Sequence, residues 1–352
     1  MAGRTPPGAG AQPGRAVVTG GAGFLGRYVC GSLLAAGTDV VCVDDFLTSA
    51  RDGIAGLLAT PGFEFHEADV SAGLDLGGPV DLVIHLASPA SPRDYQQHPL
   101  ATLDAGSSGT RNALRLAERN GARFVLASTS EVYGDPVVSP QPEDYWGHVN
   151  PVGPRSMYDE SKRFAEALTT AYRRAGRADT GIVRIFNSYG PGMRPDDGRV
   201  VPSFACRALR GEPLEVAGDG SQTRSLCYVT DTVAGILAFA ASGLDGPVNI
   251  GSPDEATVLQ IAERIIALAG SRSAITYVPR PADDPMTRCP DISLARSALG
   301  WEPRVPWDIG LAETLAWFSA RLSADTRPAR RAPRSGRTGL ATTGALRPRA
   351  AG

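Results

Sequence analysis

The chain has 352 residues, 42% of them hydrophobic, and a formal net charge of −2, which is typical of a soluble globular protein with a large core. No apolar run approaches the roughly 18 residues of a membrane-spanning helix, and the opening MAGRTPPGAGAQPGR lacks the apolar segment of a signal peptide. We therefore expect a cytoplasmic protein with no membrane partner. Five scattered cysteines without close pairs favour reduced thiols, and we expect no metal site.

Short apolar runs alternate with longer amphipathic segments after residues 1–14, which we expect to be disordered. The alternation predicts an α/β fold with a doubly wound parallel sheet (Rossmann), covered by helices on both faces. We assign residues 15–187 to this Rossmann domain. The predicted strands are 16–20, 39–44, 81–87, 123–129 and 181–187, and the predicted helices lie near 24–36, 100–119 and 156–175.

The texture changes after Asn187 to shorter units with more Pro and Gly, and with helices near 199–210, 230–242 and 256–269. We expect 188–322 to form mainly a smaller α/β substrate domain, interleaved with the first and closing over the carboxyl ends of the strands, where such sheets bind ligands. Residues 323–352 hold seven arginines and one aspartate without periodicity, so we expect a disordered tail and no nucleic-acid partner.

The stretch VTGGAGFLG places Gly20, Gly23 and Gly26 between the first predicted strand and the first predicted helix. Glycines at this spacing let the backbone approach a pyrophosphate at a helix N-terminus. Asp44 ends the second strand, 24 residues after Gly20, where a carboxylate accepts from ribose hydroxyls and repels a 2′-phosphate. The sequence therefore predicts NAD as the cofactor, in preference to NADP. Further expected cofactor contacts are Phe24, Leu25, Asp69, Val70, Leu86 and Ala87.

Tyr158 and Lys162 stand four residues apart and so share one face of a helix. Lys162 is the one lysine of the chain, beside 34 arginines. A compact ammonium can contact ribose and lower the pKa of the tyrosine at the same time. A planar guanidinium does this poorly. The alternative is a half-buried tyrosine and a surface lysine paired with Glu166.

With this pair, the glycine triplet, Asp44 and Thr129, the chain resembles the extended short-chain dehydrogenase/reductase family over about residues 15–318. Within that family it is similar to the UDP-glucuronate decarboxylases, which make UDP-xylose. Seven segments in order carry the similarity: HLASPASP (85–92), LASTSEVYGDP (126–136), EDYWGHVNPVGPRSMYDESKR (143–163), RIFNSYGP (184–191), DGRVVPSF (197–204), GDGSQTRSLCYVTD (218–231) and DDPMTRCPDIS (283–293).

The resemblance implies that Thr129, Tyr158 and Lys162 act in hydride transfer and that Glu131 is the substrate-side acid/base. It also implies oxidation at C4 of UDP-glucuronate, loss of carbon dioxide from a β-keto acid, and reduction back at C4 with tightly bound NAD. Asn187 would contact the sugar nucleotide, and Arg224 and Arg288 the diphosphate. The remaining residues expected near the substrate are Pro89, Ser130, Arg199 and Val200.

Three other activities stay open on the same scaffold. A 4,6-dehydratase needs an acid where this chain has Ser130, and a 4-epimerase or a decarboxylase that releases the 4-keto pentose would use the same hydride chemistry. A cofactor-binding scaffold protein is a rival from another class, but it has no chemical need for the acid/base set. The sequence does not separate uracil from thymine nucleotides.

Three positions depart from the resembled pattern: Gly106 where asparagine is common, Ala217 where an aromatic residue is common, and Cys289 where a basic residue is usual. The first predicts altered hydrogen bonding at the strand ends, and the other two predict a nucleotide pocket that is looser or is tuned to another base. The resemblance also implies a homodimer formed through helices 100–119 and 156–175. Apolar residues available for that interface or for the core are Leu103, Leu114, Leu116, Leu168 and Tyr172.

Overall fold

The computed structural model describes residues 12–325. Most of the two segments expected to be disordered, 1–14 and 323–352, lies outside the described residues. At the carboxyl end, the last described helix, α10 (Trp307–Asp325), continues three residues into the predicted tail.

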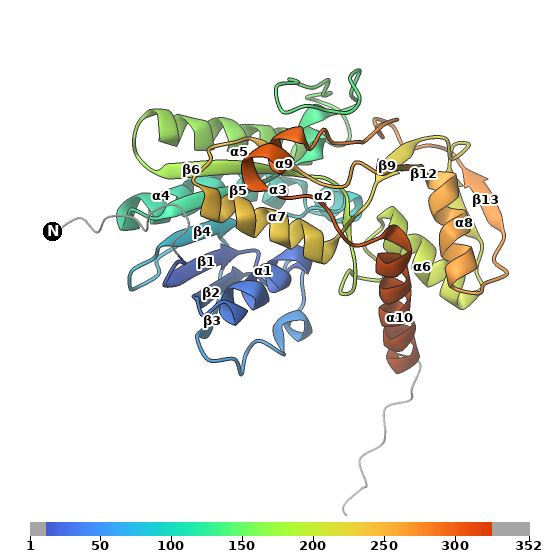
Figure 1. The fold of residues 1–352 in the computed structure, drawn as a ribbon, viewed down its shortest axis with the longest axis horizontal. Coiled ribbons are helices and arrows are strands. Elements are labelled where there is room, and N and C mark those ends of the chain that lie inside the picture. Colours follow the sequence, from blue (N-terminus) through green and yellow to red (C-terminus); the bar gives the residue numbers. More distant parts are fainter. Residues whose placement is uncertain (1–11, 326–352) are drawn as a thin grey trace, which may run out of the picture.

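A seven-stranded sheet forms the centre of the larger part of the molecule (Figure 1). Every neighbouring pair in it is parallel, and the order is β11-β6-β5-β4-β1-β2-β3. The predicted doubly wound Rossmann fold is therefore confirmed. The strands are β1 (Arg15–Thr19), β2 (Asp39–Asp44), β3 (Phe63–Glu67), β4 (Leu82–His85), β5 (Arg123–Thr129), β6 (Asp179–Ile185) and β11 (Val248–Ile250).

Helices cover both faces of the sheet (Figure 1). α1 (Phe24–Ala35) and α7 (Val229–Ser242) lie on one face, and α4 (Thr110–Asn120) and α5 (Ser156–Arg174) on the other. Because side chains alternate along a strand, Ala16 and Val18 of β1 enter the core with α1, whereas Val17 enters the core with α4. Both faces are thus dry, which explains the continuous apolar runs.

The predicted helix 100–119 is three elements. α3 (Pro99–Asp104) leads into a π-helical turn, Ala105–Gly109, and only then into α4. A Cβ at Gly106 would lie 2.6 Å from Ser161 Cβ, so the turn presses against α5. Gly106 therefore faces a helix, and the expected effect on strand-end hydrogen bonds stays a prediction.

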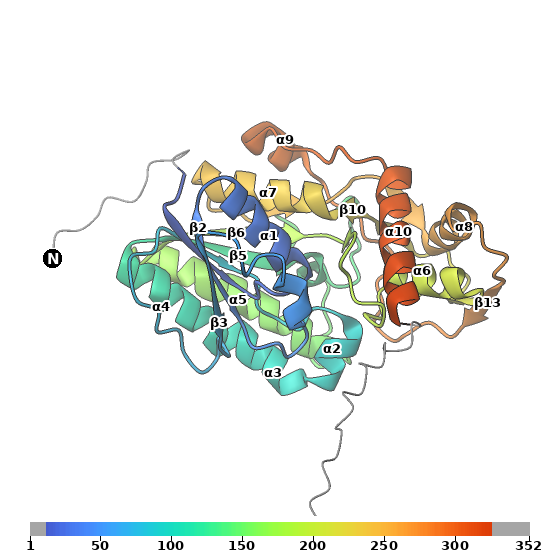
Figure 2. The same ribbon diagram turned by 90° about the horizontal axis from the view of Figure 1, so that it is seen from below.

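A smaller lobe stands beside the sheet (Figure 2). It contains α6 (Val200–Arg210), α8 (Val258–Leu268) and α10, with β8 (Leu214–Ala217) paired to β13 (Ile275–Val278). The chain crosses between the two parts. β11 is a strand of the large sheet and α7 covers that sheet, and α9 (Ser293–Leu299) packs against α7 and β11. Short pairs join the parts: β7 (Ser188–Tyr189) with β10 (Cys227–Tyr228), and β9 (Thr223–Ser225) with β12 (Glu255–Thr257).

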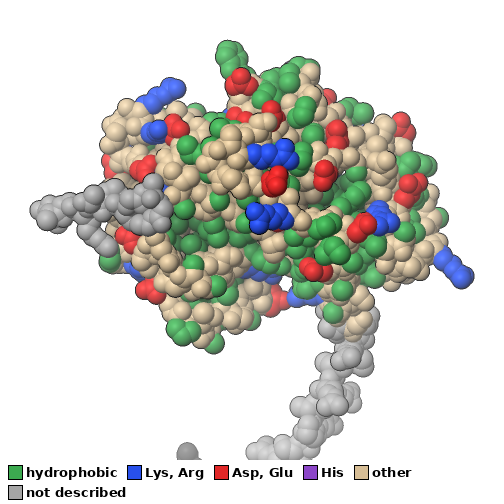
Figure 3. Space-filling view, viewed as in Figure 1, with side chains coloured by type: hydrophobic (Ala, Val, Ile, Leu, Met, Phe, Trp, Pro, Cys, Tyr) green, Lys and Arg blue, Asp and Glu red, His purple; other side chains and the backbone are tan. Residues whose placement is uncertain are grey.

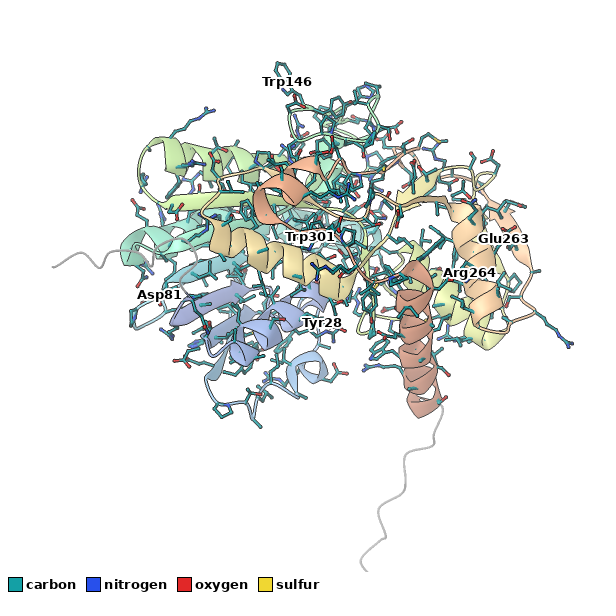
Figure 4. All side chains as sticks on the ribbon, viewed as in Figure 1. Tyr28, Asp81, Trp146, Glu263, Arg264 and Trp301 are labelled. Atoms are coloured by element: carbon teal, nitrogen blue, oxygen red, sulfur yellow. The ribbon has the colours of Figure 1, made fainter. Side chains whose placement is uncertain are left out.

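The surface seen in Figure 3 mixes basic and acidic side chains and has no broad region of one sign. The loop between β5 and α5 stands out from the body and carries Trp146, whose side chain projects into solvent (Figure 4) and is 90% exposed. None of the helices in residues 12–325 is long and apolar enough to cross a membrane.

Candidate active site

A cavity of about 960 Å³ lies between the carboxyl ends of the strands and the smaller lobe. Its volume is at the upper end for small-ligand sites. All of the predicted cofactor, catalytic and substrate residues line it: Gly20, Gly23, Phe24, Leu25, Gly26, Asp44, Asp69, Val70, Leu86, Ala87, Pro89, Thr129, Ser130, Glu131, Tyr158, Lys162, Asn187, Arg199, Val200, Arg224 and Arg288. The fold thus gathers at one place residues that span most of the described chain.

The glycine turn fits a dinucleotide pyrophosphate. Gly20 has φ +70°, and a Cβ there would lie 2.7 Å from the Ala87 nitrogen. A Cβ at Gly26 would collide with the Gly20 carbonyl oxygen. α1 begins at Phe24 with no side-chain cap and no acidic residue in its first turn, so its first N–H groups and positive end remain available for an anion.

Asp44 is held at the end of β2 with both carboxylate oxygens oriented. One accepts from the Ala22 N–H at 3.0 Å, and the other from the Phe46 N–H at 3.0 Å and the Ser49 hydroxyl at 2.7 Å. Burial raises the pKa of Asp44, and these hydrogen bonds oppose that effect. The carboxylate therefore sits fixed at the adenosine side of the turn, where ribose hydroxyls are expected.

Tyr158 and Lys162 project from the first turns of α5 toward the end of β5. Burial raises the pKa of Tyr158 to about 12, and a hydrogen bond with Thr129 opposes this rise. The ring of Tyr158 stacks on Tyr95 of α2 (Pro92–Gln97) with centroids 5.2 Å apart. The buried hydroxyl therefore has Thr129 as a hydrogen-bond partner at the strand end and an aromatic wall behind it.

The Lys162 ammonium is buried and donates to the Ala127 carbonyl at 2.8 Å. Burial lowers its pKa to about 8, against the opposing charge of Glu166. Glu166 itself is paired with Arg184 at 2.8 Å and accepts from the Ser128 hydroxyl at 2.6 Å. The alternative of a surface lysine paired with Glu166 is therefore wrong.

Glu131 follows β5 in the 3-10 turn Ser130–Tyr133 and is buried between two arginines. Its Oε2 accepts from Arg155 at 2.8 Å and from Arg288 at 2.7 Å. Burial alone would raise the pKa of Glu131, but Arg288, Arg155 and Arg224 outweigh it and hold the pKa below its usual value. Glu131 is therefore ionised at neutral pH.

The other expected substrate residues extend this cluster. Arg288 also donates to the Asn187 side-chain oxygen at 3.2 Å, while Arg224 pairs with Asp284 at 2.8 Å. Arg199 pairs with Asp197, which leaves its charge already matched. The arginines expected at the diphosphate thus line the cavity, with Arg288 turned toward Glu131.

The two pocket departures have different outcomes. Ala217 ends β8 and lines the cavity. Cys289 does not: its N–H donates to the Gln141 side chain at 2.9 Å and its thiol faces the Pro253 carbonyl. The prediction that Cys289 loosens the nucleotide pocket is therefore wrong.

Sequence reasoning missed Arg155, Tyr95 and Asp284. Arg155 is buried, bonds Glu131, lies over the Tyr95 ring at 5.9 Å, and faces Asp284 at 3.7 Å. As one of 34 arginines it carried no compositional signal. Its position three residues before Tyr158 was the available signal, because residues i and i+3 lie on one helix face. Within residues 12–325, no cluster of His, Cys, Asp and Glu is placed to hold a metal ion.

Comparison with known proteins identifies the family. Residues 16–251 match the NAD dependent epimerase/dehydratase family. The chain belongs to this family. It is 47% identical over 308 residues to UDP-glucuronic acid decarboxylase 1 of Danio rerio, covering 88% of this chain and 73% of that protein. It is also 47% identical to UDP-glucuronic acid decarboxylase 6 of Arabidopsis thaliana, covering 88% of this chain and 90% of that protein.

A solved member of the epimerase/dehydratase family has the same fold. The UDP-glucuronic acid 4-epimerase of Bacillus cereus, in complex with NAD and a fluorinated UDP-glucuronic acid, superposes with a TM-score of 0.78 at 27% identity, over 87% of this chain and 99% of that one. The predicted family, NAD as cofactor and an enzymatic role are confirmed.

Proposed function

We propose that this protein converts UDP-glucuronate to UDP-xylose and carbon dioxide with tightly bound NAD. The observation that carries the proposal is the buried group of Glu131, Arg155, Arg224 and Arg288 beside Tyr158. The guanidiniums of Arg155, Arg224 and Arg288 outnumber the two carboxylates that pair with them, Glu131 and Asp284, and so leave positive charge for an anionic ligand. A uronate carboxylate and a diphosphate supply negative charge, and relatives at 47% identity support the assignment.

The first chemical step is proton removal from the O4 hydroxyl of the sugar. When bound, NAD supplies a reversible hydride acceptor for C4. Tyr158 accepts the O4 proton, and Thr129 hydrogen-bonds the same region and orients the phenol. The Lys162 ammonium, together with the positive charge of the nicotinamide, favours the phenolate. Tyr158 returns the proton to O4 at the end of the cycle.

Loss of carbon dioxide follows because the C4 ketone is β to the carboxylate. The C5–carboxylate bond breaks, and its electron pair passes into the ketone as an enolate. The protein needs to orient the carboxylate and stabilise the oxygen that becomes negative, and Tyr158 and Thr129 lie where that oxygen is formed. Glu131 is placed to carry the proton that C5 then needs.

The test is incubation of purified protein with UDP-glucuronate and NAD⁺, with Tyr158→Phe as the matched inactive control. We expect carbon dioxide and UDP-xylose in equal amounts without net NADH. A stoichiometric rise in NADH absorbance would instead indicate release of the 4-keto pentose. A 4-epimer formed without carbon dioxide would replace the proposal with an epimerase.

Ser130 supports decarboxylation over 4,6-dehydration. It lines the cavity next to Glu131 and is buried. A hydroxyl at this position offers no strong acid to expel a 6-hydroxyl group. A uronate substrate has no such leaving group and therefore needs no acid here.

We also propose a cytoplasmic homodimer formed through α3 and α5. Leu114, Leu116 and Tyr172 are buried in the core and Leu168 is packed against it, so they leave no interface. Three other apolar side chains stay exposed on these helices: Leu100, Leu103 and Phe164. α3 packs on α5, which suits an apolar face that a second copy covers.

Light scattering tests the dimer. We expect Phe164→Glu to give a monomer, and Leu58→Glu, at an exposed leucine elsewhere, to leave the dimer intact. A monomeric parent protein, or a dimer that survives Phe164→Glu and Leu103→Glu together, would contradict the proposal.

A further inference from the structure

A second pocket, of about 400 Å³, lies directly behind the catalytic carboxylate. Arg155 and Asp284 line this pocket and also the main cavity, so they form the wall between the two. The far side of the pocket consists of the loop that follows Glu131 and the segment around His148, which contains exposed residues. The wall thus separates the site of chemistry from a second opening toward solvent.

Asp159 lines the second pocket and not the main cavity. It is 6% exposed, and its Oδ1 has no hydrogen-bond partner within the described structure. A buried carboxyl oxygen without a partner is costly unless something supplies a proton or a hydrogen bond. Asp159 follows Tyr158 in α5 and has Arg155 one turn before it on the same helix. The structure therefore places an unsatisfied carboxyl group between solvent and the catalytic wall.

The proposed reaction consumes one proton per turnover. A carboxylate leaves as neutral carbon dioxide, its electron pair stays on the sugar, and C5 gains a hydrogen. The proton that Tyr158 removes from O4 goes back to O4 and cannot serve C5. Glu131 is ionised between Arg155 and Arg288, so it holds no proton of its own to give. One proton must come from solvent in each cycle.

We propose that Asp159 relays this proton from solvent in the second pocket to Glu131, which delivers it to C5. The inference rests on the proposed decarboxylation and adds the source of its proton. Asp159 loses a proton toward Glu131, directly or through one water molecule at the Arg155 wall, and regains one from the pocket. Carbon–carbon cleavage supplies the electron pair at C5, so no further reactant is needed.

The electrostatics of α5 support a protonated relay. Burial and the charge of Glu131 raise the pKa of Asp159 to about 7, while Arg155 and Arg288 oppose the rise. Below this value the carboxyl group carries a proton that it can pass on, and above it the carboxylate predominates. The charged and titratable groups that face Asp159 are Tyr95, Glu131, Arg155, Tyr158, Glu160 and Arg288, and across the pocket Asp135, His148, Arg280, Asp283 and Asp284.

The experiment compares Asp159→Asn with Glu263→Gln, an acid-to-amide change at an exposed residue of α8 that lines neither cavity. We expect Asp159→Asn to reduce NAD⁺ at the parent rate in a single turnover with UDP-glucuronate. UDP-xylose formation should fall about 10²-fold or more, the low end for loss of a proton-transfer group. The enolate should escape and take its C5 proton from bulk solvent, so that NADH-loaded enzyme and 4-keto pentose accumulate.

The pH dependence gives a second readout. In the parent protein, the share of released 4-keto pentose should rise as the pH increases through about 7, and in Asp159→Asn it should stay high and flat. Asp159→Glu should restore UDP-xylose formation in part. If Asp159→Asn lost NAD⁺ reduction and UDP-xylose formation equally, Asp159 would have a structural role and the relay would be overturned. The relay would also be overturned if Asp159→Asn divided its product between UDP-xylose and 4-keto pentose as the parent protein does. Absence of carbon dioxide from the parent protein would instead reject the proposed function itself.

Discussion

Lys162 shows how burial sets the behaviour of one side chain. The ammonium is confined between α5 and the Ala127 carbonyl, and its pKa falls to about 8 because charge is disfavoured away from water. Below pH 8 the group is charged, and above it the charge that favours the Tyr158 phenolate is lost. The compact ammonium therefore matters for charge and for fit, since arginine stands at every other such basic position.

Lys162→Arg should fold but lose about 10²-fold or more in turnover, the range for a lost acid/base contribution. The guanidinium is wider and cannot make the single short bond to Ala127 while contacting ribose. Arg163→Lys, the next residue and partly exposed, is the control and should keep parent turnover. Steady-state rates measure the turnover and thermal melts measure the folding of both variants. Near-parent turnover in Lys162→Arg would mean that the presence of the single lysine at this position is accidental.

His85 is a buried histidine that the chemistry does not use. Its ring bridges the Thr19 hydroxyl at 2.7 Å and the Thr110 hydroxyl at 3.1 Å, linking β1, β4 and α4. Burial, helped by the Lys162 charge, lowers its pKa to about 3. The folded protein therefore holds the neutral ring, whereas the unfolded chain takes up a proton below its ordinary pKa of about 6.5.

This linkage makes the fold less stable as the pH falls below about 6.5, down to the folded pKa. Between pH 7 and pH 5, His85 should cost about 2 kcal/mol of unfolding free energy. His85→Gln removes the titration, so its stability deficit relative to the parent should shrink by about that amount over the same interval. Urea unfolding at the two pH values measures it; a constant deficit would show that the ring does not titrate on unfolding.

At the scale of elements, the π-helical turn between α3 and α4 depends on packing against α5. Gly106 leaves no room for a side chain, since a Cβ would lie 2.6 Å from Ser161 Cβ and 2.8 Å from its carbonyl oxygen. The small residue at one position thus accommodates the hydroxymethyl group at the other. The two residues should be energetically coupled, as contacting pairs are.

Gly106→Asn should destabilise the protein by about 1–3 kcal/mol, the usual cost of overpacking. Adding Ser161→Gly should recover part of that loss, because it removes the Cβ contact and leaves the carbonyl contact. Gly77→Asn, where a Cβ would meet no atom within 4 Å, is the control. A double-mutant cycle by urea unfolding measures the coupling, and strictly additive effects would count against it.

Sequence patterns predicted the elements well where burial is one-sided or complete. The runs 39–44 and 123–129 coincide with β2 and β5 because apolar stretches bounded by charged or polar ends have few alternatives. The helix predicted near 100–119 is confirmed, but its π-helical turn was missed because that turn follows from contact with Ser161, which lies over fifty residues away. The sequence analysis missed Arg155 for a similar reason, because its partner Glu131 is close to it in the fold but not in the sequence.

At the scale of the whole molecule, the segment after β7, residues 190–197, connects the two parts across the cavity. We call this segment the strap. Arg194 reaches back to the Thr48 carbonyl and to Asp94, both at 2.6 Å. The Tyr28 hydroxyl donates to the Pro191 carbonyl at 3.0 Å. These contacts enclose the cofactor side of the crevice, which suits an enzyme that must keep its reduced cofactor between two hydride transfers.

Arg194→Gln should therefore speed NAD release about tenfold or more, since it removes charge-assisted bonds of roughly 1.5–3 kcal/mol. Arg93→Gln, which removes exposed contacts to the carboxylate and the carbonyl of Asp196 on the same strap, is the control and should release NAD at the parent rate. Fluorescence of displaced NADH gives the rate. Equal release from both variants and the parent would show that the strap does not retain the cofactor.

The burial of the single lysine has a practical consequence. A protease specific for lysine can cut the chain only after residue 162, in the interior of α5, and the folded state hides that bond. Cleavage into just two fragments then reports the population of molecules in which α5 has opened. Ligands that bind only the closed site should slow this cleavage in proportion to their saturation. The rate of cleavage at the single lysine therefore measures how often the site opens.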